Sequence, residues 1–155
     1  MKLFIAIDGA CRRNGKPDCT AAGGAFIKGI DDNGDVVGYA TKSVYEYCST
    51  NQRGELLALL KALCVVIKRR CEAQIITDSE YLFNSMSKQW YNNWRNNNWL
   101  TRDGYEVKNR DIWERIAKCV DVCEQCDLDL TFYHIKGHCI PFGAVTATNA
   151  LDDDP

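Results

Sequence analysis

Three acidic side chains in this 155-residue sequence stand where strands and a helix could bring them together. Asp8 follows the apolar run 3–7, Asp78 follows the run 73–77, and Glu55 lies among leucines in a helical pattern. An Asp at a strand end, taken alone, is commonly a solvated loop or cap residue, but the leucines around Glu55 leave its helix little exposed surface. Clustered carboxylates repel one another unless a divalent cation neutralises them, and hard oxygen ligands select Mg²⁺ or Mn²⁺. The pattern therefore predicts a site for these cations.

The elements needed to position the acids follow an α/β order. A strand-helix-strand crossover joins parallel strands and is right-handed, so strand 73–77 should lie parallel to strand 3–7. Asp8 and Asp78 would then lie about one strand spacing apart, roughly 5 Å, at the edge where open α/β sheets bind ligands. Thr50 is suited to cap the intervening helix. The expected elements are strands 3–7, 22–30 and 35–47, helix 51–68, strand 73–77, a helix after Ser79, helix 111–122, strand 128–135 and helix 144–151, an order that predicts an α/β fold with a mixed sheet.

Composition sets the broad class. Hydrophobic residues make up 46% of the chain and charged residues 26%, which is ordinary for a globular protein, and we expect one domain over 1–155. No apolar run approaches the roughly 18 residues of a membrane span, and no segment has the form of a signal peptide. We therefore expect a soluble, cytoplasmic protein, a monomer with no membrane partner. Nine cysteines without an export signal predict reduced thiols, and packing is the preferred interpretation of the single C-x-x-C pair, Cys123 and Cys126.

Four ordered motifs spread over most of the chain carry a resemblance to a known family. They are Ile7-Asp8-Gly9, Thr50-Asn51-Gln52-Arg53-Gly54-Glu55-Leu56, Thr77-Asp78-Ser79 and Gly137-His138, joined by the tryptophan-rich stretch 89–99 and by Val107-Lys108-Asn109. Together they resemble the type 1 ribonuclease H family, in its cellular form with an aromatic and basic protrusion. The resemblance implies a ribonuclease H-like α/β fold, with a mixed five-stranded sheet flanked by helices.

The resemblance also implies an activity, cofactors and ligands. Enzymes of the family cut the RNA strand of RNA/DNA hybrids by two-metal-ion phosphodiester hydrolysis and leave 5′-phosphate and 3′-hydroxyl ends. By resemblance, Asp8, Glu55 and Asp78 are catalytic ligands of Mg²⁺, with Mn²⁺ as a substitute. His138 would be a proton carrier or a product-release residue, a role that the near-neutral intrinsic pKa of histidine suits. His134 falls inside a strand pattern and is expected to be structural.

The fourth carboxylate of the family has no acidic counterpart in this sequence. The family motif reads approximately Gly-Asn-Glu-x-Ala-Asp-x-Leu-Ala, whereas residues 143–151 contain no acid. Matching Leu151 with one inserted residue places Asn149 in the Asp position as catalytic residue and metal ligand, and we favour it because an amide oxygen can still touch a cation or its water. Alignment without a gap places Thr148 there, and Asp152, one helical turn further on, is a third candidate. Either neutral residue removes a negative charge, which predicts weaker binding of one ion and greater dependence on Mn²⁺.

Seven residues resemble the contacts that the family makes with its hybrid. Asn14, Asn51 and Gln52 would reach the two strands near the cut, Thr50 and Asn109 would form a pocket for a DNA phosphate, and Tyr81 and Trp94 would stack against DNA sugars. Cellular members often carry an arginine near the position of Cys48, so we expect a weaker phosphate pocket here. Without the resemblance, each amide would be interpreted as a turn or cap residue, and Trp94 equally well as a core residue.

The formal charge of -2, taken alone, argues against an RNA/DNA partner, but it averages two opposed features. Acids gather at the predicted cation site and at the C-terminal end, whereas the segment 88–110 carries five basic residues against two acids. Such a local excess of cations is expected where nucleic acid binds. We therefore favour an enzyme that cleaves the hybrid. Because the fourth acid is missing, a catalytically silent hybrid-binding module stays open, as does another nuclease or an integrase of the same fold.

Overall fold

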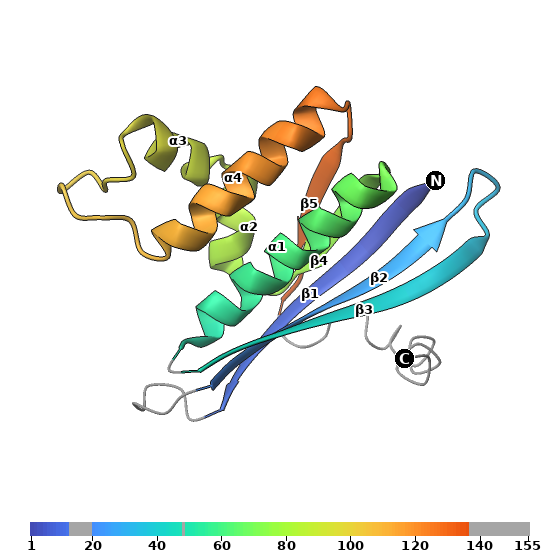
Figure 1. Cartoon of the computed structure of the whole chain (residues 1–155), viewed down its shortest axis with the longest axis horizontal. Helices are drawn as coiled ribbons and strands as arrows, with labels where there is room; N and C mark the ends of the chain where they lie inside the picture. The colour runs from blue at the N-terminus through green and yellow to red at the C-terminus, as the bar shows by residue number, and fades with distance from the viewer. Residues whose placement is uncertain (13–19, 48, 137–155) are drawn as a thin grey trace.

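A mixed five-stranded sheet forms the centre of the computed structural model, which describes residues 1–12, 20–47 and 49–136 (Figure 1). The strands are β1 (Lys2–Arg12), β2 (Thr20–Ile30), β3 (Val36–Tyr47), β4 (Glu72–Thr77) and β5 (Leu130–His134). Their order across the sheet is β3-β2-β1-β4-β5. β1 pairs antiparallel with β2 and β2 with β3, while β4 runs parallel to both β1 and β5. The predicted mixed sheet is confirmed.

The helices of the described residues are α1 (Asn51–Arg69), α2 (Glu80–Ser87), α3 (Trp90–Asn96) and α4 (Arg110–Gln125). α1 packs across β1 and β2, and α4 packs against α1 (Figure 1). α1 begins after Thr50, whose Oγ1 accepts a hydrogen bond from the backbone N–H of Arg53 at 3.2 Å, so the predicted cap is confirmed. Leu56, Leu59 and Leu63 of α1 and Trp113 of α4 are fully buried between these layers. None of these helices has the length and apolarity needed to span a bilayer.

Element boundaries differ from the prediction where tertiary contacts decide them. The stretch 89–113, which lacks a helical period, contains the short helix α3, and α4 extends to Gln125 because Val120 and Cys123 still lie on its buried face. β1 extends beyond the predicted strand 3–7 as far as Arg12, because residues 8–12 continue to pair with β2, so Asp8 lies inside the strand. β5 is shorter than the predicted strand 128–135. The predicted helix 144–151 lies outside the described residues.

Three glycines bring the first turns of α1 into backbone contact with the sheet. A Cβ on Gly23 of β2 would overlap the carbonyl oxygen of Gly54, and a Cβ on Gly54 would overlap the carbonyl oxygen of Ala22. A Cβ on Gly9 of β1 would overlap Cγ of Glu55. A glycine inside a helix costs about 1 kcal/mol relative to alanine, so Gly54 is explained by this close approach. The contact places the side chain of Glu55 directly beside Gly9 of β1, the residue after Asp8.

Substitution of Gly23 tests how tightly helix and strand are packed. Gly23→Ala should lower the free energy of unfolding by about 2 kcal/mol, because the added methyl group fits only if α1 and β2 separate. Gly38→Ala is the matched control, since a Cβ there meets nothing within 4 Å, and its effect should stay within about 0.5 kcal/mol. Urea unfolding measures both changes. Equal effects of the two substitutions would contradict the close approach.

Candidate metal and nucleic-acid site

Asp8, inside β1, and Asp78, directly after β4, lie side by side at the carboxyl end of β4, where the parallel pairing of the two strands stops. β1 and β4 pair in parallel with Ile7 opposite Thr77, and each acid is the next residue of its chain segment. The backbone N–H of Gly9 donates to Oδ1 of Asp8 at 2.9 Å, which fixes that carboxylate at the edge. The parallel register that the crossover rule predicted is therefore present, and it brings the two acids together.

Glu55 is the third acid at this edge. Its side chain is buried, and residue exposure is only 9%. The pKa of the Glu55 carboxyl is raised to about 6, mainly by burial; a hydrogen bond with Ser79 opposes the shift, and the charges of Asp78 and Asp8 add to it. Because both aspartates act on the pKa of Glu55, the three carboxylates share one electrostatic environment.

The donor set at this edge suits a divalent cation. Carboxylate oxygens are the hard ligands that Mg²⁺ and Mn²⁺ prefer, and a cation would remove the repulsion that Glu55 experiences. Asn51 adds a buried Oδ1 that has no hydrogen-bond partner in the described part of the chain. Within the described residues, no group of three His, Cys, Asp or Glu side chains is close enough to hold one ion. Ligation by Asp8, Glu55 and Asp78 therefore stays a prediction.

A cleft of about 370 Å³ opens beside Glu55. It is lined by Thr50, Asn51, Gln52, Glu55, Ser79 and Lys108. Three of these residues are predicted contacts with the hybrid, and a fourth is a predicted metal ligand. Ser79 was expected only as a helix cap and Lys108 only as one cation of the protrusion, because their place in the cleft depends on how α1, α2 and the segment before α4 pack. The cleft combines hydrogen-bonding groups, a cation and a carboxylate.

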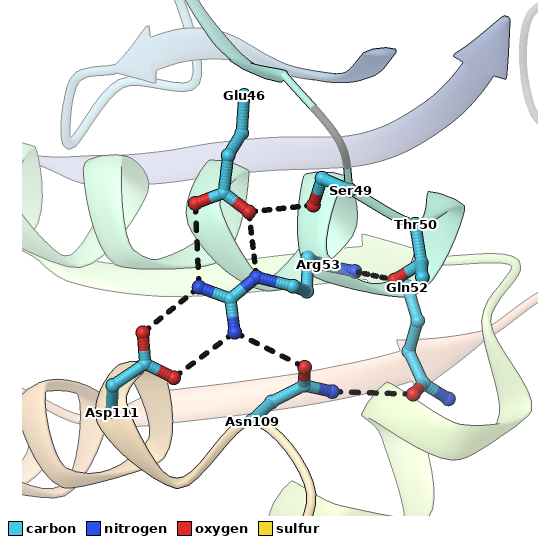
Figure 2. Close-up of polar contacts among 7 residues, drawn as sticks. All are labelled: Glu46, Ser49, Thr50, Gln52, Arg53, Asn109 and Asp111. Atoms are coloured by element: carbon cyan, nitrogen blue, oxygen red, sulfur yellow. Dashed lines mark hydrogen bonds and ion pairs between the residues drawn. The ribbon is translucent and has the colours of Figure 1, made fainter. Parts of the chain in front are cut away.

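Asn109 joins the beginning of α1 to the beginning of α4. Its Oδ1 accepts a hydrogen bond from Nη1 of Arg53 at 3.2 Å, and its Nδ2 donates to Oε1 of Gln52 at 3.3 Å (Figure 2). Asn109 is 9% exposed and has a left-handed backbone with φ of 64°. Arg53 lies in the motif from Thr50 to Leu56, but no function was predicted for it. Its position between the Thr50 cap and Gly54 was the available signal.

Tyr81 and Trp94 lie side by side against the core. Their rings are stacked with centroids 6.5 Å apart, and Nε1 of the buried Trp113 donates to the hydroxyl of Tyr81 at 2.8 Å. Trp94 also packs edge to face on Trp113, with centroids 5.6 Å apart. Both side chains are partly exposed, so the core-packing interpretation of Trp94 holds for one part of its surface, while stacking against sugars stays a prediction.

The basic residues of the segment 88–110 are not equally available to a polyanion. Arg95 pairs with Asp121 at 2.7 Å, and Arg110 pairs with Glu114 at 2.5 Å. The other three, Lys88, Arg102 and Lys108, form no ion pair within the described residues. Of the five basic residues of this segment, these three are therefore the ones available to a polyanion.

Several predicted site residues lie outside the described residues. They are Asn14, His138 and Asn149, together with the alternatives Thr148 and Asp152. The structure therefore describes Asp8, Thr50, Asn51, Gln52, Glu55, Asp78, Tyr81, Trp94 and Asn109 of the predicted set. Among these, Thr50, Asn51, Gln52 and Glu55 share one cleft.

Known proteins share this arrangement of sequence and fold. The model of the family described as RNase H matches residues 1–151. The chain belongs to the ribonuclease H family. A protein named Ribonuclease H from Rickettsia canadensis is 32% identical over 146 residues, which cover 94% of this chain and 84% of that protein. The Ribonuclease H of Nitratidesulfovibrio vulgaris is 39% identical over 90 residues, 58% of this chain and 54% of that protein.

A solved structure supports the same fold. The crystal structure of LC9-RNase H1, a type 1 RNase H with the type 2 active-site motif, superposes with a TM-score of 0.75 at 20% identity. The match covers 97% of this chain and 69% of that chain. The ribonuclease H family consists of hydrolases that cut the RNA strand of RNA/DNA hybrids, and its members generally use divalent metal ions.

Glu55→Gln separates the electrostatic cost of the acid cluster from its function. Without metal at pH 8, the substitution should raise the free energy of unfolding by on the order of 1 kcal/mol, because it removes a buried charge facing two others. Glu80→Gln is the control, since Glu80 is exposed on α2. Chemical unfolding in a metal chelator measures both variants. A destabilised Glu55→Gln protein would show that the three acids do not repel one another.

Proposed function

We propose that Asp8, Glu55 and Asp78 hold the divalent cations of a ribonuclease H active site, with Mg²⁺ as the cofactor and Mn²⁺ as a substitute. The observation that carries this proposal is the parallel register of Ile7 and Thr77, which sets two acids at one sheet edge, with the buried Glu55 carboxyl under the charge of both. The substrate is the RNA strand of an RNA/DNA hybrid.

The reaction is hydrolysis of a phosphodiester. A water molecule gives up one proton as its oxygen bonds to phosphorus, the bond from phosphorus to the 3′ oxygen breaks, and that oxygen takes up a proton, so the products are a 5′-phosphate and a 3′-hydroxyl. When bound, the divalent cations lower the pKa of the attacking water and stabilise charge on the leaving oxygen. The protein's own part begins with Gly9, whose N–H holds the Asp8 carboxylate, and with Ser79, which hydrogen-bonds the Glu55 carboxyl.

The remaining groups bind and orient the hybrid. Thr50, Asn51 and Gln52 line the cleft with Lys108, so hydrogen bonds and one positive charge are available to a sugar-phosphate strand beside Glu55. Asn109 packs against Gln52 at the border of this cleft, and Asn14 would reach the second strand. Tyr81 and Trp94 offer aromatic surface to a sugar. His138 would carry a proton or assist product release.

A fourth ligand completes the site in our proposal, and Asn149 is the residue that we assign to it. Its amide oxygen resembles one carboxylate oxygen but carries no full charge, so one cation should bind more weakly. The neutral residue at the fourth ligand position also supports the second candidate function, a hybrid-binding module that cleaves slowly or not at all.

A cleavage assay on a labelled RNA/DNA hybrid tests the proposal. Asp78→Asn should lower the rate by more than the roughly 10- to 100-fold that the loss of an outer-shell metal partner costs, while the affinity for the hybrid changes little. Asp129→Asn is the control, because Asp129 is exposed before β5, and it should cleave normally. Binding without cleavage in either Mg²⁺ or Mn²⁺ would favour the binding module. Cutting of plain DNA would favour another nuclease of the fold.

Asn149→Asp tests the fourth position. Restoring a negative charge should raise the Mg²⁺-supported cleavage rate and lower the Mg²⁺ concentration that gives half of it. Thr148→Asp is the matched variant for the alignment without a gap. Metal titrations of the cleavage rate compare them. An unchanged or lower rate of Asn149→Asp removes Asn149 from the position, and a gain in Thr148→Asp alone assigns Thr148 instead.

A further inference from the structure

Arg53 uses all of its N–H donors within the protein. Nε and Nη2 donate to the two carboxylate oxygens of Glu46 at 2.6 and 3.3 Å, and Nη1 and Nη2 donate to those of Asp111 at 3.0 and 2.8 Å (Figure 2). The second N–H of Nη1 goes to Oδ1 of Asn109 at 3.2 Å. A guanidinium has five N–H donors, so Arg53 links β3, α1 and α4 and has none left over.

The guanidinium of Arg53 is held in place from both sides, by Glu46 and by Asp111. Arg53 lowers the pKa of the Glu46 carboxyl and that of the Asp111 carboxyl, so both stay ionised at neutral pH. The hydroxyl of Ser49 donates a further hydrogen bond to Glu46 at 2.5 Å. Paired N–H donors facing a carboxylate fix the plane as well as the place of a guanidinium. The N–H that faces Asn109 therefore has a fixed direction.

This direction sets the orientation of two amides. A guanidinium can only donate, so the atom of Asn109 that faces it must be the oxygen, and the nitrogen must lie on the other side. That nitrogen donates to Oε1 of Gln52 at 3.3 Å. Gln52 in turn has its nitrogen on the side away from Asn109 (Figure 2). This Nε2 donates no hydrogen bond within the described residues, because the contact with Asn109 uses Oε1. Each hydrogen bond in the chain therefore fixes which end of the next amide is the donor, first for Asn109 and then for Gln52.

We propose that Arg53 is a positioning residue that acts through Asn109 to hold Gln52 with its N–H₂ group presented as a donor to a phosphate oxygen of the hybrid. The inference rests on the proposed hybrid site, and Gln52 lines that cleft together with Lys108. A phosphate oxygen only accepts hydrogen bonds, so the opposite orientation of Gln52 would place an amide oxygen against it. The cation of Lys108 favours the same ligand.

A role of Arg53 in protein stability alone explains these contacts less well than a role in binding. The side chain of Asp111 is 67% exposed, and exposed ion pairs contribute at most about 1 kcal/mol. The two carboxylates would satisfy a purely structural role of Arg53. The fifth N–H instead donates to the buried, neutral amide of Asn109, which is hydrogen-bonded to the cleft residue Gln52. That contact is the part of the network that a binding role requires.

Steady-state cleavage of an RNA/DNA hybrid by four proteins tests the proposal. They are the unaltered chain, Arg53→Met, Gln52→Leu and the double variant. Each single substitution should raise KM roughly 10-fold, the loss expected for one hydrogen bond to a charged oxygen, with kcat changed less than about twofold. The double variant should be no worse than either single one, because the two residues act as a unit. Additive effects on KM would overturn the proposal.

Asp111→Asn separates the ion pair from the amide orientation. It weakens the link to α4 but leaves the hydrogen bond from Arg53 to Asn109, so the melting temperature should fall while KM stays within about twofold of the unaltered protein. Arg53→Lys keeps a positive charge but lacks the planar fork, and should raise KM as Arg53→Met does. If Arg53→Met fails to fold, Arg53→Lys provides the same comparison. Normal KM in Arg53→Lys would overturn the proposal.

Side-chain amide signals give a readout that needs no hybrid. In ¹⁵N NMR spectra of the free protein, the N–H₂ resonances of Gln52 should shift in Arg53→Met and stay in place in Asp111→Asn. Unchanged Gln52 resonances in Arg53→Met would overturn the relay. A Gln52→Leu protein with normal KM would overturn it too, yet leave the proposed metal site standing if Asp78→Asn still loses cleavage. A hybrid carrying uncharged methylphosphonates at the contacted phosphates should remove the difference in KM between Arg53→Met and the unaltered chain.

Discussion

The backbone contact between the first turns of α1 and the strands β1 and β2 is the constraint on which the rest of the site depends. Gly23 and Gly54 allow the helix to lie against the sheet without intervening side chains, and Gly9 leaves room for the Glu55 side chain. Successive residues of a helix point about 100° apart. With Gly54 turned to the strands, its two neighbours must point to either side: Glu55 to the sheet edge with the aspartates, and Arg53 toward β3 and α4. One contact therefore orients both the acid and the arginine.

This constraint brings like charges together, and the fold tolerates it. Burial and the charges of Asp78 and Asp8 raise the pKa of Glu55 to about 6, so the ionised cluster opposes folding in the absence of a cation. The leucines and Trp113 that pack along the same helix stabilise it against this repulsion. Function often requires such locally unfavourable groups. The formal charge of -2 conceals this arrangement because it averages the acid cluster with the unpaired cations of the segment 88–110.

The sequence predicts those parts of the site that depend on local pattern and on crossover geometry. Asp8 and Asp78 each follow a short apolar run, the parallel pairing of the two runs follows from the intervening helix, and Thr50 caps that helix. The relation of Arg53 to Asn109 could not be predicted, because 56 residues separate them along the chain and only the packing of α4 on α1 joins them. The shared packing of Tyr81 and Trp94 on Trp113 likewise depends on tertiary contacts. α3 was missed because seven residues rich in Trp and Asn carry no helical period.

One turn of α1 therefore carries a group that favours cations and a group that favours anions. Glu55 favours cations, whereas Gln52, oriented through Arg53 and Asn109, presents donors to an anion. Both lie on α1, which begins after the Thr50 cap, so the spacing between the predicted cation position and the predicted phosphate position is set by helix geometry rather than by a loop. A phosphodiester needs its phosphate backbone held at one fixed distance from the groups that attack it. The close approach at Gly54 supplies that distance, which explains why a glycine that weakens the helix occupies its first turn.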